Sequence, residues 1–231
     1  MNLLALETAT EACSIALWID GEVRERFEIA PRRHTELALP WAEQLLAEAG
    51  LAKSQLDAIA CGRGPGAFTG VRLAVALTQG LAFALDRPVV PISTLAALAF
   101  DATSVPGDVV ATAIDARMGE VYFGLFERAE HEVIALEPER LSPPASVRLA
   151  AARRCLGVGT GFDAEHGALR SALSESLQRV DATALPRAAA IARLAAVAYG
   201  RGDTLAPERL EPAYLRDKVA LTLAEQGKVP S

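Results

Sequence analysis

Cysteine is scarce in this chain of 231 residues, which contains three cysteines and no CxxC pair. Cys13, Cys61 and Cys155 are an odd number of thiols, and two of them lie in apolar runs typical of strands, where a buried free thiol is the ordinary case. The sequence therefore argues against a disulfide framework, and we expect a reducing compartment.

Histidine is equally rare, and the chain contains no HExxH or HxxxH pair and no GxSxG elbow. These absences exclude the common histidine-based metal sites and the serine-hydrolase nucleophile. His131 and His166 are isolated, whereas His34 stands in the polar run 32–36. We interpret His34 as a helix-start residue whose ring is hydrogen-bonded by nearby backbone.

The chain also lacks an excess of positive charge, since its formal net charge is −6. A surface that grips nucleic-acid phosphates needs a basic patch, so any role with RNA is expected to be indirect. The N-terminus begins as a strand without a basic segment and cleavage site, and the apolar tract 71–100 is interrupted by polar residues and prolines. We expect neither secretion nor a membrane span, and hence a cytoplasmic protein.

Hydrophobic residues make up 51% of the chain, which is enough for one large or two small packed domains. Hydrophobic patterning predicts strands at 2–6, 12–19 and 22–29, a helix at 35–49 that contains Pro40, a strand at 59–61, a helix at 70–85, a strand at 89–92 and a helix at 94–100. The segment 101–107 collects turn residues and reads as a domain boundary.

The second half repeats the beginning. Residues 108–137 again read as three strands joined by turns, and Asp115 follows its strand as Glu7 follows the first one. A short helix to Arg154, a strand at 155–158 and an alanine-rich helix at 186–199 come next. We therefore predict an α/β protein of two duplicated domains, 1–102 and 103–231, with a poorly ordered tail after about residue 224.

The stretch 57–88 is the most distinctive part of the chain, because its helix is apolar on every side. Such a helix must be covered both by its own sheet and by something else. One interpretation is that both covers come from this chain. The other is a docking helix, in which small residues such as Ala76 and Gly80 admit a partner helix and Leu77 and Leu81 anchor it.

The glycine-rich loop before this helix has rival interpretations. Gly62, Gly64 and Ala67 satisfy the GxGxxA pattern of dinucleotide sites, but the helix starts late and Asp86 precedes the next strand. No lysine follows the last glycine, so a P-loop also fails. An equally good interpretation is that these glycines only allow the backbone conformation of a structural turn.

Glu7 and Asp115 occupy positions where carboxylates could hold a metal-bound phosphate between two domains, and the loop Gly157–Gly161 could pass close to an adenosine. The turns after Glu7 and Asp115 are not lined by glycine, which leaves their backbone less free to approach a phosphate. Nucleotide binding and a purely structural frame both stay open.

Six segments carry a family resemblance. They are LALETATEACSIAL, RRHTELALP, GRGPGAFTGVR, PISTLAALA, DARMGEVYFGLF and PAYLR, in this order. Together they resemble the TsaB (YeaZ) family of bacterial tRNA-modification proteins over nearly the whole chain. The resemblance implies the actin-like ATPase fold (ASKHA, ribonuclease H-like), with two βββαβα-type domains.

The resemblance further implies a catalytically silent paralogue of TsaD, the transferase that moves a threonylcarbamoyl group onto the adenosine beside the anticodon. TsaD-like chains carry an HxxxH metal site where this chain has Ser93–Leu98. Implied partners are TsaD, TsaE through the TsaB–TsaD complex, and a second copy of this chain when TsaD is absent. No cofactor is required by the chain itself, and ATP, ADP or a metal enters only with the complex.

The resemblance places the partner or dimer interface on the helices at 35–49 and 70–85, at His34, Leu37, Trp41, Leu45, Val71, Ala74, Leu77, Thr78, Leu81 and Leu85. Vestigial nucleotide-site candidates are Glu7, Thr8, Asp115, Gly157, Gly159 and Gly161. The alternative function is an actin-like enzyme, either a small-molecule kinase or an M22-type metallopeptidase, although the chain lacks the phosphate loops and histidines that these need.

Overall fold

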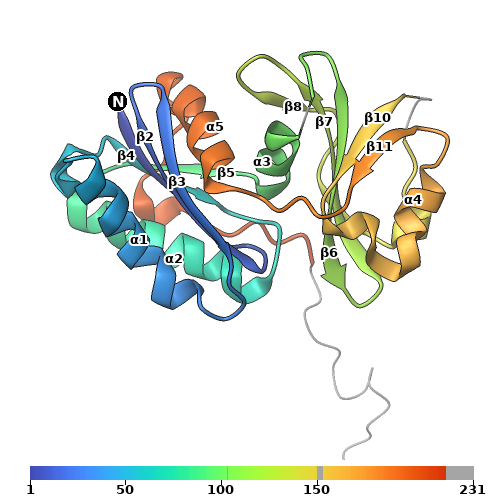
Figure 1. Ribbon diagram of the computed structural model, residues 1–231, viewed down its shortest axis with the longest axis horizontal. Helices are drawn as coiled ribbons and strands as arrows, with labels where there is room; N and C mark the ends of the chain where they lie inside the picture. Colours follow the sequence, from blue (N-terminus) through green and yellow to red (C-terminus); the bar gives the residue numbers. More distant parts are fainter. Residues whose placement is uncertain (103, 150–152, 217–231) are drawn as a thin grey trace, which may run out of the picture.

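The structure is a computed structural model that describes residues 1–102, 104–149 and 153–216. These residues form two lobes, each built on a mixed β-sheet with helices against it (Figure 1). The α/β class expected from the sequence is confirmed.

The first lobe contains a five-stranded sheet in the order β3-β2-β1-β4-β5. Its strands are β1 (Asn2–Glu7), β2 (Ala12–Ile19), β3 (Glu22–Ile29), β4 (Ala58–Gly62) and β5 (Val89–Ile92). The first three strands are joined by short turns and run antiparallel, whereas β4 and β5 lie parallel to β1 because a helix precedes each of them.

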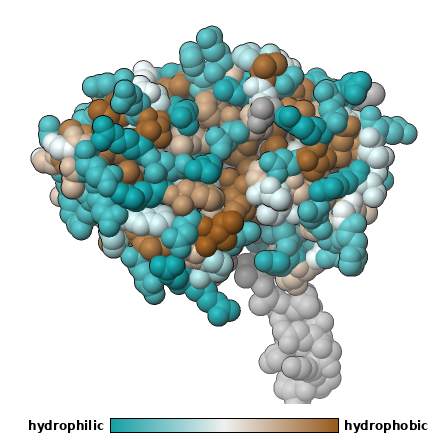
Figure 2. Space-filling view, in the orientation of Figure 1, coloured by the Kyte–Doolittle hydropathy of each residue, from teal (hydrophilic) through white to brown (hydrophobic). Residues whose placement is uncertain are grey.

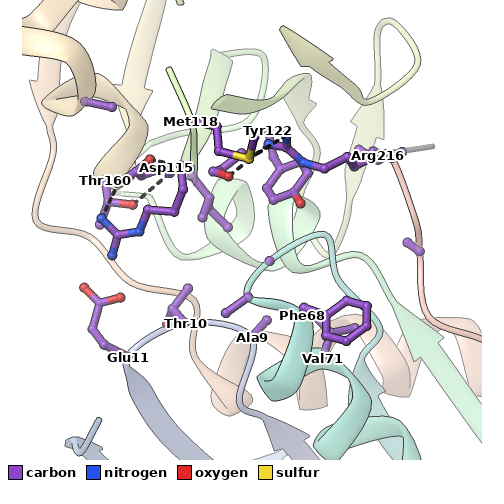
Figure 3. Close-up of a pocket in the computed structure, with 18 of the residues that line it drawn as sticks. Ala9, Thr10, Glu11, Phe68, Val71, Asp115, Met118, Tyr122, Thr160 and Arg216 are labelled. Atoms are coloured by element: carbon purple, nitrogen blue, oxygen red, sulfur yellow. Dashed lines mark hydrogen bonds and ion pairs between the residues drawn. The ribbon is translucent and has the colours of Figure 1, made fainter. Parts of the chain in front are cut away.

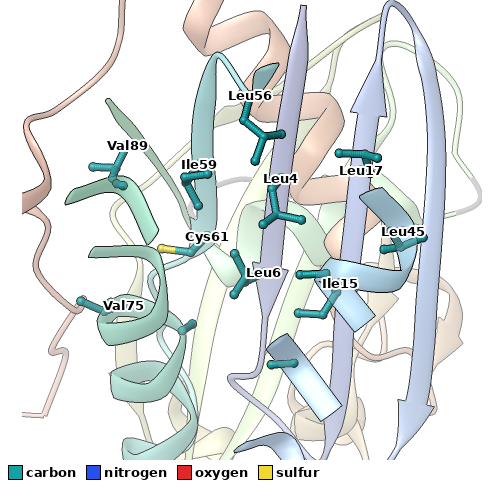
Figure 4. Packing of buried hydrophobic residues seen from close by; sticks show 14 of the residues in the cluster. Leu4, Leu6, Ile15, Leu17, Leu45, Leu56, Ile59, Cys61, Val75 and Val89 are labelled. Atoms are coloured by element: carbon teal, nitrogen blue, oxygen red, sulfur yellow. The ribbon is translucent and has the colours of Figure 1, made fainter. Parts of the chain in front are cut away.

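Strand alternation divides the core of this lobe into two layers. Leu4 and Leu6 point to the face covered by α1 (His34–Glu48) and α2 (Phe68–Leu85), as Figure 4 shows for this layer. Leu3 and Ala5 point to the opposite face, which α5 (Ala188–Gly200) covers. Both faces of the first sheet are therefore buried by helices.

The second lobe repeats this topology. Its strands are β6 (Val109–Arg117), β7 (Glu120–Arg128), β8 (Val133–Ala135), β9 (Arg140–Ser142), β10 (Cys155–Val158) and β11 (Leu177–Asp181). The order β11-β10-β6-β7-β8 mirrors that of the first sheet, with β7 and β8 antiparallel and β10 and β11 parallel. The duplication predicted from the sequence is thus present in the strand order.

The helices of the second lobe are reduced. Its only α-helix in the described residues is α4 (Ala168–Ala172), accompanied by short 3-10 turns such as Pro144–Ser146 and Thr160–Phe162. The helix predicted to end at Arg154 is not found at 147–149 or 153–154, and the rest of that prediction lies outside the described residues. The predicted disordered tail after residue 224 also lies outside them.

The division at residue 103 needs a correction. The sequence predicts that residues 103–231 form the second domain, but α5 packs in the core of the first lobe, with Ile191 fully buried in one cluster with Leu3 and Ala5. The segment after it stays with that lobe, because Leu205 exchanges two backbone hydrogen bonds with Val89 of β5. The first lobe is therefore built from both ends of the chain.

The remaining helix, α3 (Thr94–Asp101), lies between the lobes (Figure 1). Leu95, Leu98 and Ala99 pack into a cluster with Val110 and Phe126 of the second sheet. Ser93 caps the helix by accepting the backbone N–H groups of residues 95 and 96, each at 3.1 Å. The two lobes thus share one buried helix at their junction.

By length and composition α2 could span a membrane, which no other helix in the described part of the chain could do. One such helix is weak support for a membrane protein, because the core helices of globular proteins pass the same test. In this fold Ala74, Val75 and Ala82 of α2 pack against the first sheet.

The glycine loop before α2 lies against the turn between β1 and β2. A Cβ atom on Gly70 would fall 2.0 Å from the carbonyl oxygen of Thr8, and one on Gly66 would fall 2.4 Å from that of Ala9. The hydroxyl of Thr8 donates to the carbonyl of Gly70 at 2.7 Å. Glycine is required here because two backbones touch, so the structural interpretation of this loop accounts for Gly66 and Gly70.

We expect opposite effects from the same substitution at two glycines of α2. Gly70→Ala should lower the free energy of unfolding by about 2–3 kcal/mol, since its methyl group meets backbone. Gly80→Ala should raise it by about 0.5–1 kcal/mol, because its methyl group points into open space and alanine favours the helix. Urea denaturation measures both, and equal effects at the two positions would contradict this packing.

Candidate functional site

A cleft of about 880 Å³ lies between the lobes. Ala9, Thr10 and Phe68 contribute to it from the first lobe, and Asp115 and Thr160 from the second (Figure 3). The C-terminal residues 213–216 form part of the wall. The volume falls within the range of about 300–1,000 Å³ common for small-molecule sites, so this cleft is the main candidate site.

The lining of the cleft includes three aromatic side chains. Phe68, Tyr122 and Tyr214 line it, and Figure 2 shows hydrophobic residues gathered between the two lobes. The guanidinium of Arg72 lies 3.6 Å from the ring centroid of Phe68, and its Nε donates to the Tyr214 hydroxyl at 2.8 Å. This stacked group joins α2 to the C-terminal segment at the edge of the cleft.

The β6–β7 turn overhangs the cleft in an unusual conformation. Arg117, Met118 and Gly119 all have positive φ, at 61°, 57° and 74°. Asp115 stabilises the turn, because its carboxylate accepts the Arg117 backbone N–H and pairs with the Arg117 guanidinium, both at 2.8 Å. Asp115, a nucleotide-site candidate, therefore does line the cleft, but within the described residues its carboxylate is bonded to its own turn.

Glu7 and Thr8 do not line the cleft, since their exposed fractions are 1% and 0%. One carboxylate oxygen of Glu7 accepts the Ala9 backbone N–H at 2.6 Å, and the other accepts the Thr94 hydroxyl at 3.0 Å. The Thr94 hydroxyl in turn accepts the Gly64 N–H at 3.2 Å. Glu7 thus links the β1–β2 turn, the glycine loop and α3, and burial raises its pKa to about 7.

The glycines of the loop 157–161 serve close packing in this structure. A Cβ atom on Gly159 would lie 2.3 Å from the Ala113 carbonyl oxygen, and one on Gly161 would lie 2.7 Å from the Ala113 side chain. Gly157 lines a separate cavity of about 240 Å³ beside α3. Thr160, which the sequence interpretation did not select, is the residue of this loop that reaches the main cleft, and its hydroxyl accepts the Asp115 N–H at 3.2 Å.

The interface residues expected from the resemblance fall into two groups. Leu45, Ala74 and Thr78 are at most 2% exposed inside the first lobe, and Val71, which lines the cleft, is 4% exposed, so none of the four is available to a partner in this conformation. The other six are half-buried, namely His34, Leu37, Trp41, Leu77, Leu81 and Leu85. All of these except His34 pack against the core of the first lobe.

His34 lines the cleft beside the β1–β2 turn, and its Nε2 lies 3.0 Å from the Thr10 carbonyl oxygen and 3.2 Å from that of Ala12. Because both partners are acceptors, Nε2 carries a proton and donates it. The ring is hydrogen-bonded by backbone, as predicted, but by a turn distant in sequence and not by its own helix start.

The most exposed face of α2 was predicted only in part, through Ala76 and Gly80. It carries Phe68, Arg72, Ala76, Gly80 and Phe83, all exposed and spaced at helical intervals. We call these five residues the α2 stripe. Phe68 is 46% and Phe83 is 59% exposed. The sequence offered no polar face from which to find this stripe, because every side of α2 is apolar.

Comparison with known proteins gives a consistent result. The family model for TsaD, described as tRNA N6-adenosine threonylcarbamoyltransferase, matches residues 27–222. The chain is 39% identical over 225 residues to the tRNA threonylcarbamoyladenosine biosynthesis protein TsaB of Escherichia coli K12, covering 95% of this chain and 96% of the relative. It is 40% identical to the TsaB protein of Haemophilus influenzae, covering 95% of each.

The chain belongs to the TsaB family. A structure described as YeaZ from Pseudomonas aeruginosa superposes with a TM-score of 0.83 at 43% identity, covering 93% of this chain and 99% of that one. A second Pseudomonas aeruginosa structure, described as an uncharacterized protein with similarity to peptidase YeaZ, gives a TM-score of 0.86 at 44% identity, with the same coverage. The predicted actin-like fold is confirmed.

TsaB relatives are named for tRNA threonylcarbamoyladenosine biosynthesis, and this pathway is the setting of the chain. Among the described residues, no three His, Cys, Asp or Glu side chains are grouped so that they could hold a metal ion. Arg32 and Glu11 both line the cleft, and neither makes a hydrogen bond or ion pair to another described side chain. They are the charged groups that face the cleft without a protein partner there.

The buried Glu7 predicts a pH dependence of stability. Its pKa rises from 4.5 in the unfolded chain to about 7 in the fold, so the folded state keeps a proton that the unfolded state releases between these values. Stability should therefore fall as the pH rises from about 4.5 to about 7, by a total of about 3 kcal/mol at about 1.4 kcal/mol per pKa unit.

Glu7→Gln keeps the shape of the side chain without the charge, so it should remove most of this slope and exceed the wild type in stability above pH 7. Glu11→Gln, at an exposed carboxylate in the same turn, is the control and should leave the slope unchanged. Urea denaturation at several pH values measures both. An unchanged slope in Glu7→Gln would show that Glu7 is not the titrating group.

Proposed function

We propose that this chain is the non-catalytic subunit that binds TsaD and supports transfer of the threonylcarbamoyl group from threonylcarbamoyl-AMP to the adenosine beside the anticodon of tRNAs. Membership of the TsaB family supports the pathway. The α2 stripe supports the docking role, since it leaves two aromatic rings of an apolar helix in water.

The stripe has the shape that helix docking requires. Ala76 and Gly80 lie at its centre, and a Cβ atom on Gly80 would meet nothing within 4 Å. A partner helix can approach closely over these two residues, while Phe68 and Phe83 offer large anchors at the two ends. Leu39 of α1, which is 40% exposed, adds apolar surface from the other helix on the same face of the sheet.

The occupant of this face is TsaD in the complete system and a second copy of the chain when TsaD is absent. Either interface should bury about 1,200–2,000 Å², so the stripe would form its centre and the exposed residues of α1 its margin.

TsaE joins through the TsaB–TsaD complex, and the net charge of −6 favours an indirect contact with tRNA. Under this proposal the chain works in the cytoplasm, and ATP, ADP or a metal belongs to the complex.

Catalytic silence is the second half of the proposal. A phosphate bound at the β1–β2 turn would need room beside that turn, but here Gly66 and Gly70 pack directly on Thr8 and Ala9. Glu7 is buried beneath that contact and bonded to Ala9 and Thr94. We therefore expect the isolated chain to hydrolyse no ATP above background and to modify no tRNA. Turnover by the pure protein, abolished by a cleft substitution such as Asp115→Asn, would reverse this expectation.

The docking role is tested with two charge-introducing substitutions at exposed apolar residues. Phe83→Glu lies in the α2 stripe and should weaken co-purification with TsaD at least tenfold, because a carboxylate would be buried in the interface. Ile134→Glu, at a residue 50% exposed on β8 of the second lobe, is the control and should bind normally. Both proteins should keep wild-type unfolding free energies within about 0.5 kcal/mol.

The cellular measurement is the threonylcarbamoyladenosine content of tRNA after depletion of the native protein and rescue by each variant. Rescue by Ile134→Glu and failure by Phe83→Glu is the expected pattern. Normal TsaD binding and full rescue by a folded Phe83→Glu protein would contradict docking through the α2 stripe. Normal threonylcarbamoyladenosine after depletion without rescue would remove the pathway role itself.

A further inference from the structure

We propose that residues 205–216, here called the strap, form a latch that holds the two lobes in one relative position, and that docking on the α2 stripe favours the latched state. The second part rests on the proposed function. The strap begins on the first lobe, runs along α2 and ends with a side chain bonded to the second lobe.

The strap is fixed to the first lobe along its length. Leu205 pairs with Val89 at the edge of the sheet, and Leu210 is 2% exposed in the core beneath α2. Gln79 of α2 donates to two strap carbonyl oxygens, those of Pro207 at 3.0 Å and Leu210 at 3.2 Å. The Ala213 N–H then donates to the Arg63 carbonyl at 2.8 Å, so the strap moves with the first lobe.

Arg216 crosses to the second lobe. Its guanidinium pairs with Glu120 of β7 at 2.8 Å and donates to the Ala116 carbonyl at 3.0 Å. The two side chains are 17% and 27% exposed, which gives the pair more shielding from water than an ordinary surface ion pair has. Arg216 thus bonds to both sides of the β6–β7 turn, and its guanidinium also contacts the Met118 sulfur at 3.5 Å.

The position of this contact makes it a latch. The backbone crosses between the lobes between α3 and β6 and again between β11 and α5, and α3 contacts both β6 and α5. Ser93 at the start of α3 also bonds to Glu139 of the second lobe. These contacts form a hinge at the junction helix. The Arg216–Glu120 ion pair instead joins the two lobes across the cleft. A rotation about the hinge would change the separation of the lobes at this point.

The latch is coupled to the α2 stripe through one residue. Arg72 belongs to the stripe, stacks on Phe68 and donates to the Tyr214 hydroxyl, two residues before Arg216. A partner that covers Phe68 and Arg72 restrains Tyr214 and hence the end of the strap. By linkage, a partner that prefers the latched state must bind more weakly when the latch is broken.

Three variants test the latch in the full chain. Arg216→Ala and Glu120→Gln each break the ion pair, and the double reversal Arg216→Glu with Glu120→Arg restores its charges. Arg170→Ala is the matched control, because it removes an ion pair with Asp163 that lies within the second lobe. Circular dichroism and urea unfolding verify that each protein is folded.

The lobe separation is measured with nitroxide labels on Gln44→Cys and Glu175→Cys, exposed positions in opposite lobes, while the three native thiols stay buried. The two single variants should broaden the label-to-label distance distribution and raise amide hydrogen exchange at 115–119 at least tenfold. The double reversal should restore both towards wild type, and Arg170→Ala should change neither. Wild-type distances and exchange in Arg216→Ala and Glu120→Gln would overturn the latch.

Binding to TsaD is measured on the same unlabelled proteins by titration calorimetry. A loss of affinity of at least fivefold in both single variants, recovered in the double reversal, supports the coupling. Unchanged affinity despite broadened distances overturns it. If wild type fails to bind TsaD while the distances respond, the proposed function fails and the latch itself is supported, so the two failures are distinguishable.

Discussion

The contact between the glycine loop and the first-strand turn organises the first lobe. Two glycines allow the start of α2 to lie directly on the backbone of Thr8 and Ala9, and the carboxylate of Glu7 closes the space beneath them. This contact sets the position of α2 on the sheet, and with it the side of α2 that points to solvent. The same packing fills the space directly beside the β1–β2 turn.

The fold was largely predictable because the hydrophobic residues of its strands follow clear patterns in the sequence. The bounds of β2, β3, β5 and β10 match the predicted ones, since each strand is a short apolar or alternating run between turn residues. The lobe assignment of α5 was not predictable, because an alanine-rich helix fits either sheet equally well. Its partner is decided by distant contacts, such as the Glu25 carboxylate that accepts the Ala189 N–H at 3.0 Å.

The candidate site was less predictable than the fold. Asp115 was placed at the cleft from the repeat alone, whereas Phe68, Tyr122, Tyr214 and Arg216 were not selected. Two of the six recognised segments, DARMGEVYFGLF and PAYLR, meet at the Arg216 contact, but a sequence does not reveal that segments almost 100 residues apart touch. The side of α2 that faces solvent could not be predicted for another reason. A helix that is apolar on every side has no polar face to indicate which residues meet water.

The return of α5 to the first sheet has a consequence for synthesis on the ribosome. Strands β1 to β5 emerge first, yet α3 covers only part of the face that carries Leu3, Ala5 and Ala16, and α5, which completes the cover, ends at residue 200. The nascent N-terminal sheet therefore stays partly uncovered while the whole second lobe is translated. We expect the two lobes to complete folding together and not one after the other. A chain truncated before α5 would keep the five strands of the first sheet but expose an apolar face of that sheet. Chaperones bind exposed apolar surfaces of this kind.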